Sequence, residues 1–297
     1  MNSVLFVFPF AILWLGILIV LYGRITVGTA FTAFSLIGFA YLGRIDVLAI
    51  IPIGLLSIFT FLTTYFHNEP KSSAKGTIYK ISFALTILLS FAIAMHAFTG
   101  FNNPIIASNT QLSSDSPPFT LYWNIDKTFV AFCLVLVYVS INQYDAIPRK
   151  RMFRNGVLSG ILVLFITLSI AWGTGLVRWE PKLPDLFVWW FVGNLFITCV
   201  AEEVFFRGII QYQLEQSLKA LTRYAWLIAL VISGLLFGIA HYAQGPLYVM
   251  VAIIAGCGYG LVYYVTKKIE ASILTHLLLN AIHFLMFSYP MYRPSLM

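Results

Sequence analysis

Apolar runs close to the length of a membrane helix follow one another along most of this chain. About 20 consecutive apolar residues are needed to cross the hydrocarbon core of a bilayer. We therefore predict an all-α fold, a polytopic transmembrane helical bundle of about 8–10 membrane segments. The runs lie near residues 4–22, 25–43, 47–66, 80–99, 128–142, 156–177, 186–206, 224–241, 247–265 and 270–288.

Composition supports a membrane protein and excludes a nucleic-acid-binding one. The chain is 60% hydrophobic and 10% charged, whereas a soluble domain is about 25% charged. Its net charge of +7 comes from basic residues in short loops, which is what the positive-inside rule produces. We expect the lipid bilayer as a partner and no nucleic acid.

The loop charges also predict an orientation. Basic residues gather around 71–80, 149–154 and 267–268, whereas the polar loop 101–127 is nearly neutral. Strict alternation then places the basic loops in the cytoplasm and both termini outside. The first apolar run has no basic residue before it, so we expect a retained helix there rather than a signal peptide.

The groups able to do chemistry inside the membrane are concentrated in the second half of the chain. We therefore divide it into an N-terminal transmembrane region of unknown role, 1–150, and a catalytic core, 151–297. The cysteines, Cys133, Cys199 and Cys257, are scattered through apolar runs and predict neither a disulfide framework nor a zinc cluster.

Two adjacent carboxylates and an arginine follow directly after the apolar run 187–201. These are Glu202, Glu203 and Arg207. One charged residue at the centre of a membrane helix costs about 2.5–3.5 kcal/mol on insertion scales, so the cluster predicts a functional site. On a helix Glu203 and Arg207 share a face and pair. Glu202 points about 100° away and is left free for chemistry.

Two further polar pairs have the same four-residue spacing. Phe237 precedes His241, and His276 precedes Asn280. If 187–220 and 224–241 form an antiparallel hairpin that turns near 221–223, residue 241 falls opposite about 203. We therefore expect His241 beside the glutamates, with His276 and Asn280 facing the same cavity.

These patterns, EExxxR, FxxxH and HxxxN in this order, resemble the signature of the CAAX prenyl endopeptidase and bacteriocin-processing superfamily, known as CPBP or Abi. Members resemble the Ras-converting enzyme. The resemblance covers about 156–289, and the stretch from Asn194 to Gly208 is typical of bacterial members. It implies an integral, multi-pass protein of the bacterial inner (plasma) membrane.

The resemblance also implies an activity, that of an intramembrane endopeptidase acting on a membrane-associated protein or peptide. Carried over to this chain, Glu202 is the general base for water and His241 holds that water. His276 and Asn280 polarise the scissile carbonyl, while Glu203 and Arg207 support the site.

Metal dependence stays open at this point, because Glu and His bind zinc and the family has been described both with and without an essential metal. The cofactor is thus either a divalent metal such as zinc or none. Two other functions also use buried charges: a non-catalytic membrane scaffold, or pseudoenzyme, and an ion-coupled transporter. A transporter favours repeats in both halves, which this chain lacks.

Overall fold

The structure is a computed structural model that describes residues 5–142 and 148–293. Among these residues, six helices are long and apolar enough to cross a membrane, and three shorter apolar helices accompany them. The chain is therefore an all-α, multi-pass integral membrane protein, as the sequence predicts. The six longer helices are Val47–Phe66, Ala74–Ala94, Lys150–Gly173, Phe187–Leu218, Pro246–Thr266 and Ile269–Met286.

The chain divides into two compact units. Within the described residues, the first contains 5–105, 122–142 and 196–201, and the second contains 106–121, 148–195 and 202–293. Our division by function at residue 150 falls next to residues 143–147, which lie outside the described part. That division stays a prediction.

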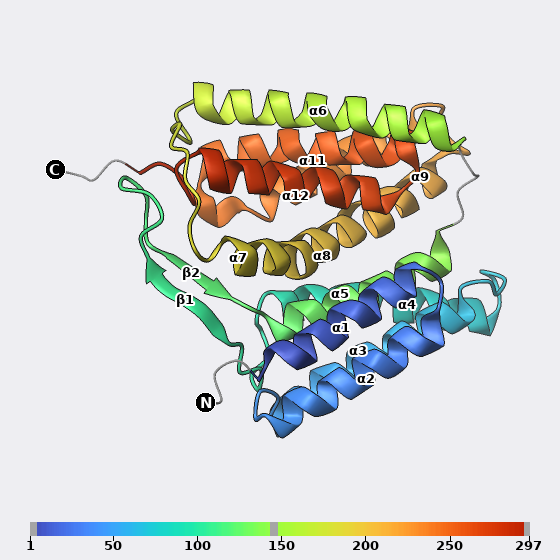
Figure 1. The fold of residues 1–297 in the computed structure, drawn as a ribbon. Helices are drawn as coiled ribbons and strands as arrows, with labels where there is room; N and C mark the ends of the chain where they lie inside the picture. The colour runs from blue at the N-terminus through green and yellow to red at the C-terminus, as the bar shows by residue number, and fades with distance from the viewer. Residues whose placement is uncertain (1–4, 143–147, 294–297) are drawn as a thin grey trace. The chain divides into compact units, whose positions relative to one another are not determined.

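The first unit is built around one central helix, α5 (Ile125–Ile141), which is buried along most of its length. The helix α5 packs against three others of the unit, α1, α3 and α4, and a helix that is apolar all round suits such a place. Figure 1 shows these helices from blue to green. The other helices are α1 (Val7–Leu21), α2 (Ile25–Tyr41), α3 (Val47–Phe66) and α4 (Ala74–Ala94).

The second unit holds α6 (Arg149–Gly173), α10 (Ala225–Ile239), α11 (Pro246–Thr266) and α12 (Ile269–Met286). Figure 1 shows α6 lying along α11 and α12. It also holds most of the long helix 187–218. That helix runs through α7 (Phe187–Gly193), the π-helical stretch η1 (Asn194–Cys199), α8 (Val200–Glu203), the π-helical stretch η2 (Val204–Gln211) and α9 (Tyr212–Leu218).

Helix starts differ from the predicted ones where polar residues continue a helix beyond its apolar run. Helix α4 begins at Ala74 rather than near residue 80, because Ser73 Oγ accepts the Gly76 amide at 3.0 Å and caps it. Helix α6 begins at Arg149 rather than near residue 156, so its basic residues lie in the first turns of a helix and not in a loop.

The polar segment 101–127 is more ordered than the loop that the sequence predicts. It contains a two-stranded sheet, β1 (Ile105–Thr110) and β2 (Phe119–Tyr122). The Gln111 side chain donates to the backbone carbonyls of Ser113 and Ser116 between the strands. Side-chain to backbone bonds of this kind stabilise a turn, and hydropathy alone does not reveal them.

The loop before α7 is held against the segment after α12. Ser288 donates its amide to Arg178 O at 2.8 Å, and Glu180 donates to Met286 O at 2.9 Å. Tyr292 donates to Leu176 O at 2.9 Å. This pairing fixes the start of α7 relative to the end of α12, the two helices next to which the site is built.

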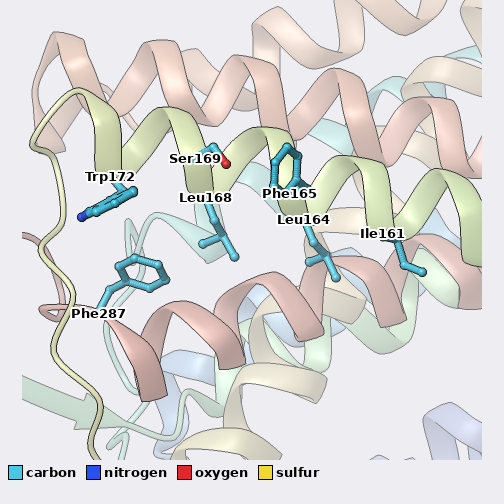
Figure 2. A pocket seen from close by; sticks show the side chains of 7 residues that line it. All are labelled: Ile161, Leu164, Phe165, Leu168, Ser169, Trp172 and Phe287. Carbon is cyan, nitrogen blue, oxygen red and sulfur yellow. The ribbon is translucent and has the colours of Figure 1, made fainter.

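An apolar groove of about 330 Å³ runs along α6. Figure 2 shows Leu164 and Leu168 of α6 and Phe287, just beyond α12, at this groove. Phe165 and Trp172 on the same helix are 69% and 60% exposed. An exposed face of this composition suits lipid tails.

Candidate active site

Glu203 lies at the centre of a buried network in the second unit. Its Oε1 is 2.9 Å from His276 Nδ1, and its Oε2 accepts Ser272 Oγ at 2.5 Å. Arg207 Nε lies 3.2 Å from Oε2, and both residues of this ion pair are fully buried. Both carboxylate oxygens are therefore engaged. The pairing that the four-residue spacing predicts is present.

Arg207 is held by more than this carboxylate. Its Nη2 donates to Gly256 O of α11 at 2.8 Å, and its guanidinium carbon lies 4.5 Å from the Phe237 ring centroid. Nε and Nη1 have no hydrogen bond of good geometry among the described residues. The contact with Glu203 is thus an ion pair rather than a well-aligned hydrogen bond.

Glycines let α11 approach the helix that carries the glutamates. Gln211 Nε2 donates to Gly260 O at 3.0 Å, one turn beyond the Arg207 contact. A Cβ on Gly260 would lie 2.7 Å from Gln211 Oε1. Small residues allow backbones of membrane helices to pack closely, and here they bring carbonyl oxygens within reach of buried side chains.

Glu202 has a different environment from its neighbour. The residue is half-buried, and its Oε2 is buried without a hydrogen-bond partner among the described residues. Tyr248 of α11 is near enough to interact with its charge. A buried carboxylate oxygen without a donor is uncommon, and it leaves this oxygen able to accept a proton.

His241 follows the end of α10, and one of its ring nitrogens is hydrogen-bonded to the backbone of that helix. Its Nδ1 lies 2.8 Å from Phe237 O. A carbonyl oxygen only accepts, so Nδ1 donates, and Nε2 of the neutral ring carries the lone pair. The Phe237 ring contacts both His241, at 4.9 Å, and His276, at 5.7 Å between centroids.

His276 and Asn280 lie one turn apart on α12. His276 Nδ1 donates to Glu203, because an ionised carboxylate accepts only. Its ring also stacks on Tyr259 at 4.6 Å. Asn280 Nδ2 donates to Asn194 Oδ1 at 3.1 Å. Of these partners Glu203 belongs to the predicted set, whereas Tyr259 and Asn194 do not.

The predicted hairpin is present, with a turn between Leu218 and Ala225. Ser233 Oγ donates to Phe206 O at 2.8 Å, and Phe237 contacts the Phe206 ring at 5.3 Å between centroids. The observed register therefore lies within about one helical turn of the expected one. Direct proximity of His241 to the carboxylates stays a prediction.

The stretches on both sides of the glutamates are π-helical, which the sequence did not predict. They span Asn194–Cys199 and Val204–Gln211, so α8 with the glutamates lies between two irregular turns. π-Helical turns are rare and occur frequently at functional sites. The helix is thus distorted at the residues that carry the predicted chemistry.

One comparison with known proteins bears on this site. A model of the type II CAAX prenyl endopeptidase Rce1-like family matches residues 184–282, a third of the chain. We call residues 184–282 the Rce1-like domain, after this match. The match covers every predicted site residue and indicates a protease of the CAAX endopeptidase type. No curated protein and no solved structure matches this chain.

The Rce1-like domain contains partners that sequence reasoning missed. Ser272 and Gln211 are both fully buried. Asn194 accepts a hydrogen bond from Asn280. The sequence nevertheless contains a feature that could have indicated each of these three residues. Ser272 lies four residues before His276, Gln211 lies four residues after Arg207, and Asn194 is a polar residue within an apolar run. Polar stripes at this spacing mark one helix face.

The arrangement of the Rce1-like domain does not fit a resident metal ion. Across 5–142 and 148–293, no three His, Cys, Asp or Glu side chains gather to hold one, whereas a catalytic zinc takes three protein ligands. Both Glu203 oxygens are already engaged, by Ser272, Arg207 and His276. No step below is therefore assigned to a metal.

Proposed function

We propose that this protein is an intramembrane endopeptidase that hydrolyses a peptide bond of a membrane-associated protein or peptide, with Glu202 as the general base. The observation that carries the proposal is the contrast between two adjacent carboxylates. Glu203 is fully buried and engaged at both oxygens. Glu202 keeps a buried oxygen without a partner among the described residues.

The base acts on water. Glu202 takes a proton from a water molecule, and the hydroxide oxygen forms a bond to the scissile carbonyl carbon. The carbonyl oxygen becomes an oxyanion. When the C–N bond breaks, the proton on Glu202 passes to the leaving amine, so that the carboxylate is regenerated. General-base catalysis of this kind contributes about 100- to 10,000-fold.

The histidines take different roles because their partners differ. His241 donates Nδ1 to a neutral carbonyl, so its Nε2 accepts a hydrogen bond from the attacking water. His276 donates Nδ1 to Glu203, and a carboxylate behind an imidazole stabilises its cation. We assign His276 the role of oxyanion donor through Nε2, which requires both ring nitrogens to carry a proton.

Asn280 supplies the second donor to the oxyanion, through Nδ2. Preorganised donors aimed at the developing charge are the largest single contribution in many enzymes, about 100- to 1000-fold for each one. Glu203 and Arg207 take no part in proton transfer. They are positioning residues that hold His276 and the helix distortion in place.

The setting of the site favours substrates that reach it from the bilayer. The glutamates lie on a helix of 32 residues that is long and apolar enough to span a membrane, and the site residues lie within 151–297. We propose a bacterial inner membrane as the location and a membrane-associated peptide as the substrate. The region 1–150 has no chemical role in this mechanism.

The proposal is tested by comparing the membrane proteomes of three strains: wild type, a strain without the protein, and one that carries Glu202→Ala. We expect peptide termini that occur only in the wild type. Both other strains should accumulate the uncleaved precursor. If Glu202→Ala restores every terminus that the deletion removes, the protein acts as a scaffold and the proposal is wrong.

A further inference from the structure

Asn280 is hydrogen-bonded to Asn194, a residue that has no role in the mechanism above. Its Nδ2 donates to Asn194 Oδ1 at 3.1 Å, across 86 residues of sequence. Asn194 is the first residue of η1, and it lies eight residues before Glu202 on the same continuous helix. Asn280 lies one turn after His276 on α12. The bond therefore joins the helix of the base to the helix of the oxyanion donors.

The two ends of an asparagine amide are nearly the same in shape and opposite in function. The NH₂ end donates two hydrogen bonds, and the oxygen end only accepts. An amide free to rotate would turn its oxygen toward the oxyanion part of the time, and that contact is repulsive. An acceptor fixed beside Nδ2 removes this alternative, because the flipped amide would bring two oxygens together.

We propose that Asn194 is a positioning residue of the peptidase, which accepts a hydrogen bond from Asn280 and thereby sets the direction of its Nδ2 donor. The inference rests on the proposed function and adds a residue to it. Asn194 touches neither the substrate nor the attacking water; it acts through Asn280. Both residues are half-buried, so the pair lies at the border of the buried network.

The surrounding structure supports a fixed position for both residues. Trp190, one turn before Asn194, stacks on Phe284, one turn after Asn280, with ring centroids 4.1 Å apart. Trp190 Nε1 also donates to Tyr289 Oη at 3.1 Å. A second contact between the same two helices thus holds them together next to the asparagine pair.

A purely structural bond between helices would have a different signature. Hydrogen bonds between membrane helices contribute only weakly to stability in double-mutant cycles. Loss of such a bond would lower stability slightly and leave turnover of the folded enzyme unchanged. A positioning role instead lowers kcat while KM stays the same, because the donor matters in the transition state.

The test is a double-mutant cycle on kcat with purified protein in detergent and a peptide that the wild type cleaves. We expect Asn194→Leu to lower kcat about 10- to 100-fold with KM unchanged, a part of the loss caused by removing an oxyanion donor. In an Asn280→Leu background the same change should have no further effect. Asn194→Asp, which keeps an acceptor, should lie closer to the wild type than Asn194→Leu.

Controls separate this inference from the proposed function. Thr198→Val, a matched loss of a polar group on the same helix, should keep the wild-type kcat. Thermal unfolding of each variant identifies any that fails to fold. If Asn194→Leu does not fold, the kcat of Asn194→Asp is compared with that of the wild type instead. An equal loss in both backgrounds, or an unchanged kcat in Asn194→Leu, overturns the role of Asn194 while hydrolysis stands. A wild type that cleaves no peptide overturns the proposed function and this inference together.

Discussion

His276 donates its Nδ1 proton to Glu203 Oε1 at 2.9 Å, although the two residues are 73 positions apart in the sequence. This bond engages Nδ1 of His276 and leaves Nε2 as the other ring nitrogen. It also occupies one oxygen of Glu203, whose other oxygen binds Ser272 and Arg207. In the proposed mechanism Glu203, the second glutamate of the EE pair, is therefore a positioning residue, and Glu202 is the base.

The buried ion pair predicts an unusual ranking of stabilities. Arg207→Ala should lower the free energy of unfolding by about 3–5 kcal/mol, because it leaves the fully buried Glu203 carboxylate without its cation. The double variant Glu203→Gln with Arg207→Met should be more stable than Arg207→Ala, since no lone charge remains. Thermal unfolding in detergent measures both.

The double variant should nevertheless be inactive in a cleavage assay, because Glu203→Gln removes the charged partner of His276. A double variant no more stable than Arg207→Ala would show that the two residues are not energetic partners. The distinction between a supporting pair, Glu203 and Arg207, and a separate base, Glu202, would then fail.

Arg207→Lys should lose most activity although it keeps the charge. The guanidinium reaches Glu203 through Nε and Gly256 O through Nη2 at the same time, and it lies over the Phe237 ring. A lysine ammonium on a flexible stem does not reproduce a planar fork. The measurement is kcat/KM of the purified variant, and wild-type turnover would contradict this account of Arg207.

Gly260→Ala should destabilise the protein by about 1–3 kcal/mol, because the new methyl group would overpack against Gln211. Gly54→Ala in α3 is the matched control. A Cβ there meets nothing within 4 Å, and the change should stabilise the helix by about 0.5–1 kcal/mol. Thermal unfolding distinguishes them, and equal effects would argue against close packing at Gly260.

The sequence predicts those parts of this molecule that depend on local spacing. The apolar runs mark the helices, because span length follows from the thickness of the bilayer. The Glu203–Arg207 pair follows from four-residue spacing on one helix. The order of the polar patterns is enough to indicate the family that the Rce1-like match confirms.

The remaining parts depend on packing between distant segments. Ser272 binds Glu203 across 69 positions, and Arg207 binds the carbonyl of Gly256 across 49. A backbone carbonyl carries no mark in the sequence, so the second contact was not predictable. The π-helical turns around the glutamates likewise follow from tertiary context rather than from residue propensities.

Removal of divalent metals should leave turnover unchanged. No three His, Cys, Asp or Glu side chains gather among residues 5–142 and 148–293, and Glu202 itself activates the water in the mechanism above, so that mechanism needs no ion. Purified enzyme treated with a chelator, then dialysed and assayed, measures this directly. Loss of activity that returns on addition of zinc would show that a metal takes part and would contradict the mechanism without an ion.

The most direct test of the account is the turnover of purified Glu202→Gln, with Glu270→Gln as the control at an exposed position of α12. Glutamine keeps the shape of the side chain and removes the basic oxygen. The account predicts that kcat falls at least about 100-fold, the low end of a general-base contribution, while thermal unfolding stays at the wild-type temperature. The control should keep full activity. Near-normal turnover by folded Glu202→Gln would remove this residue from the role of base and contradict the central claim.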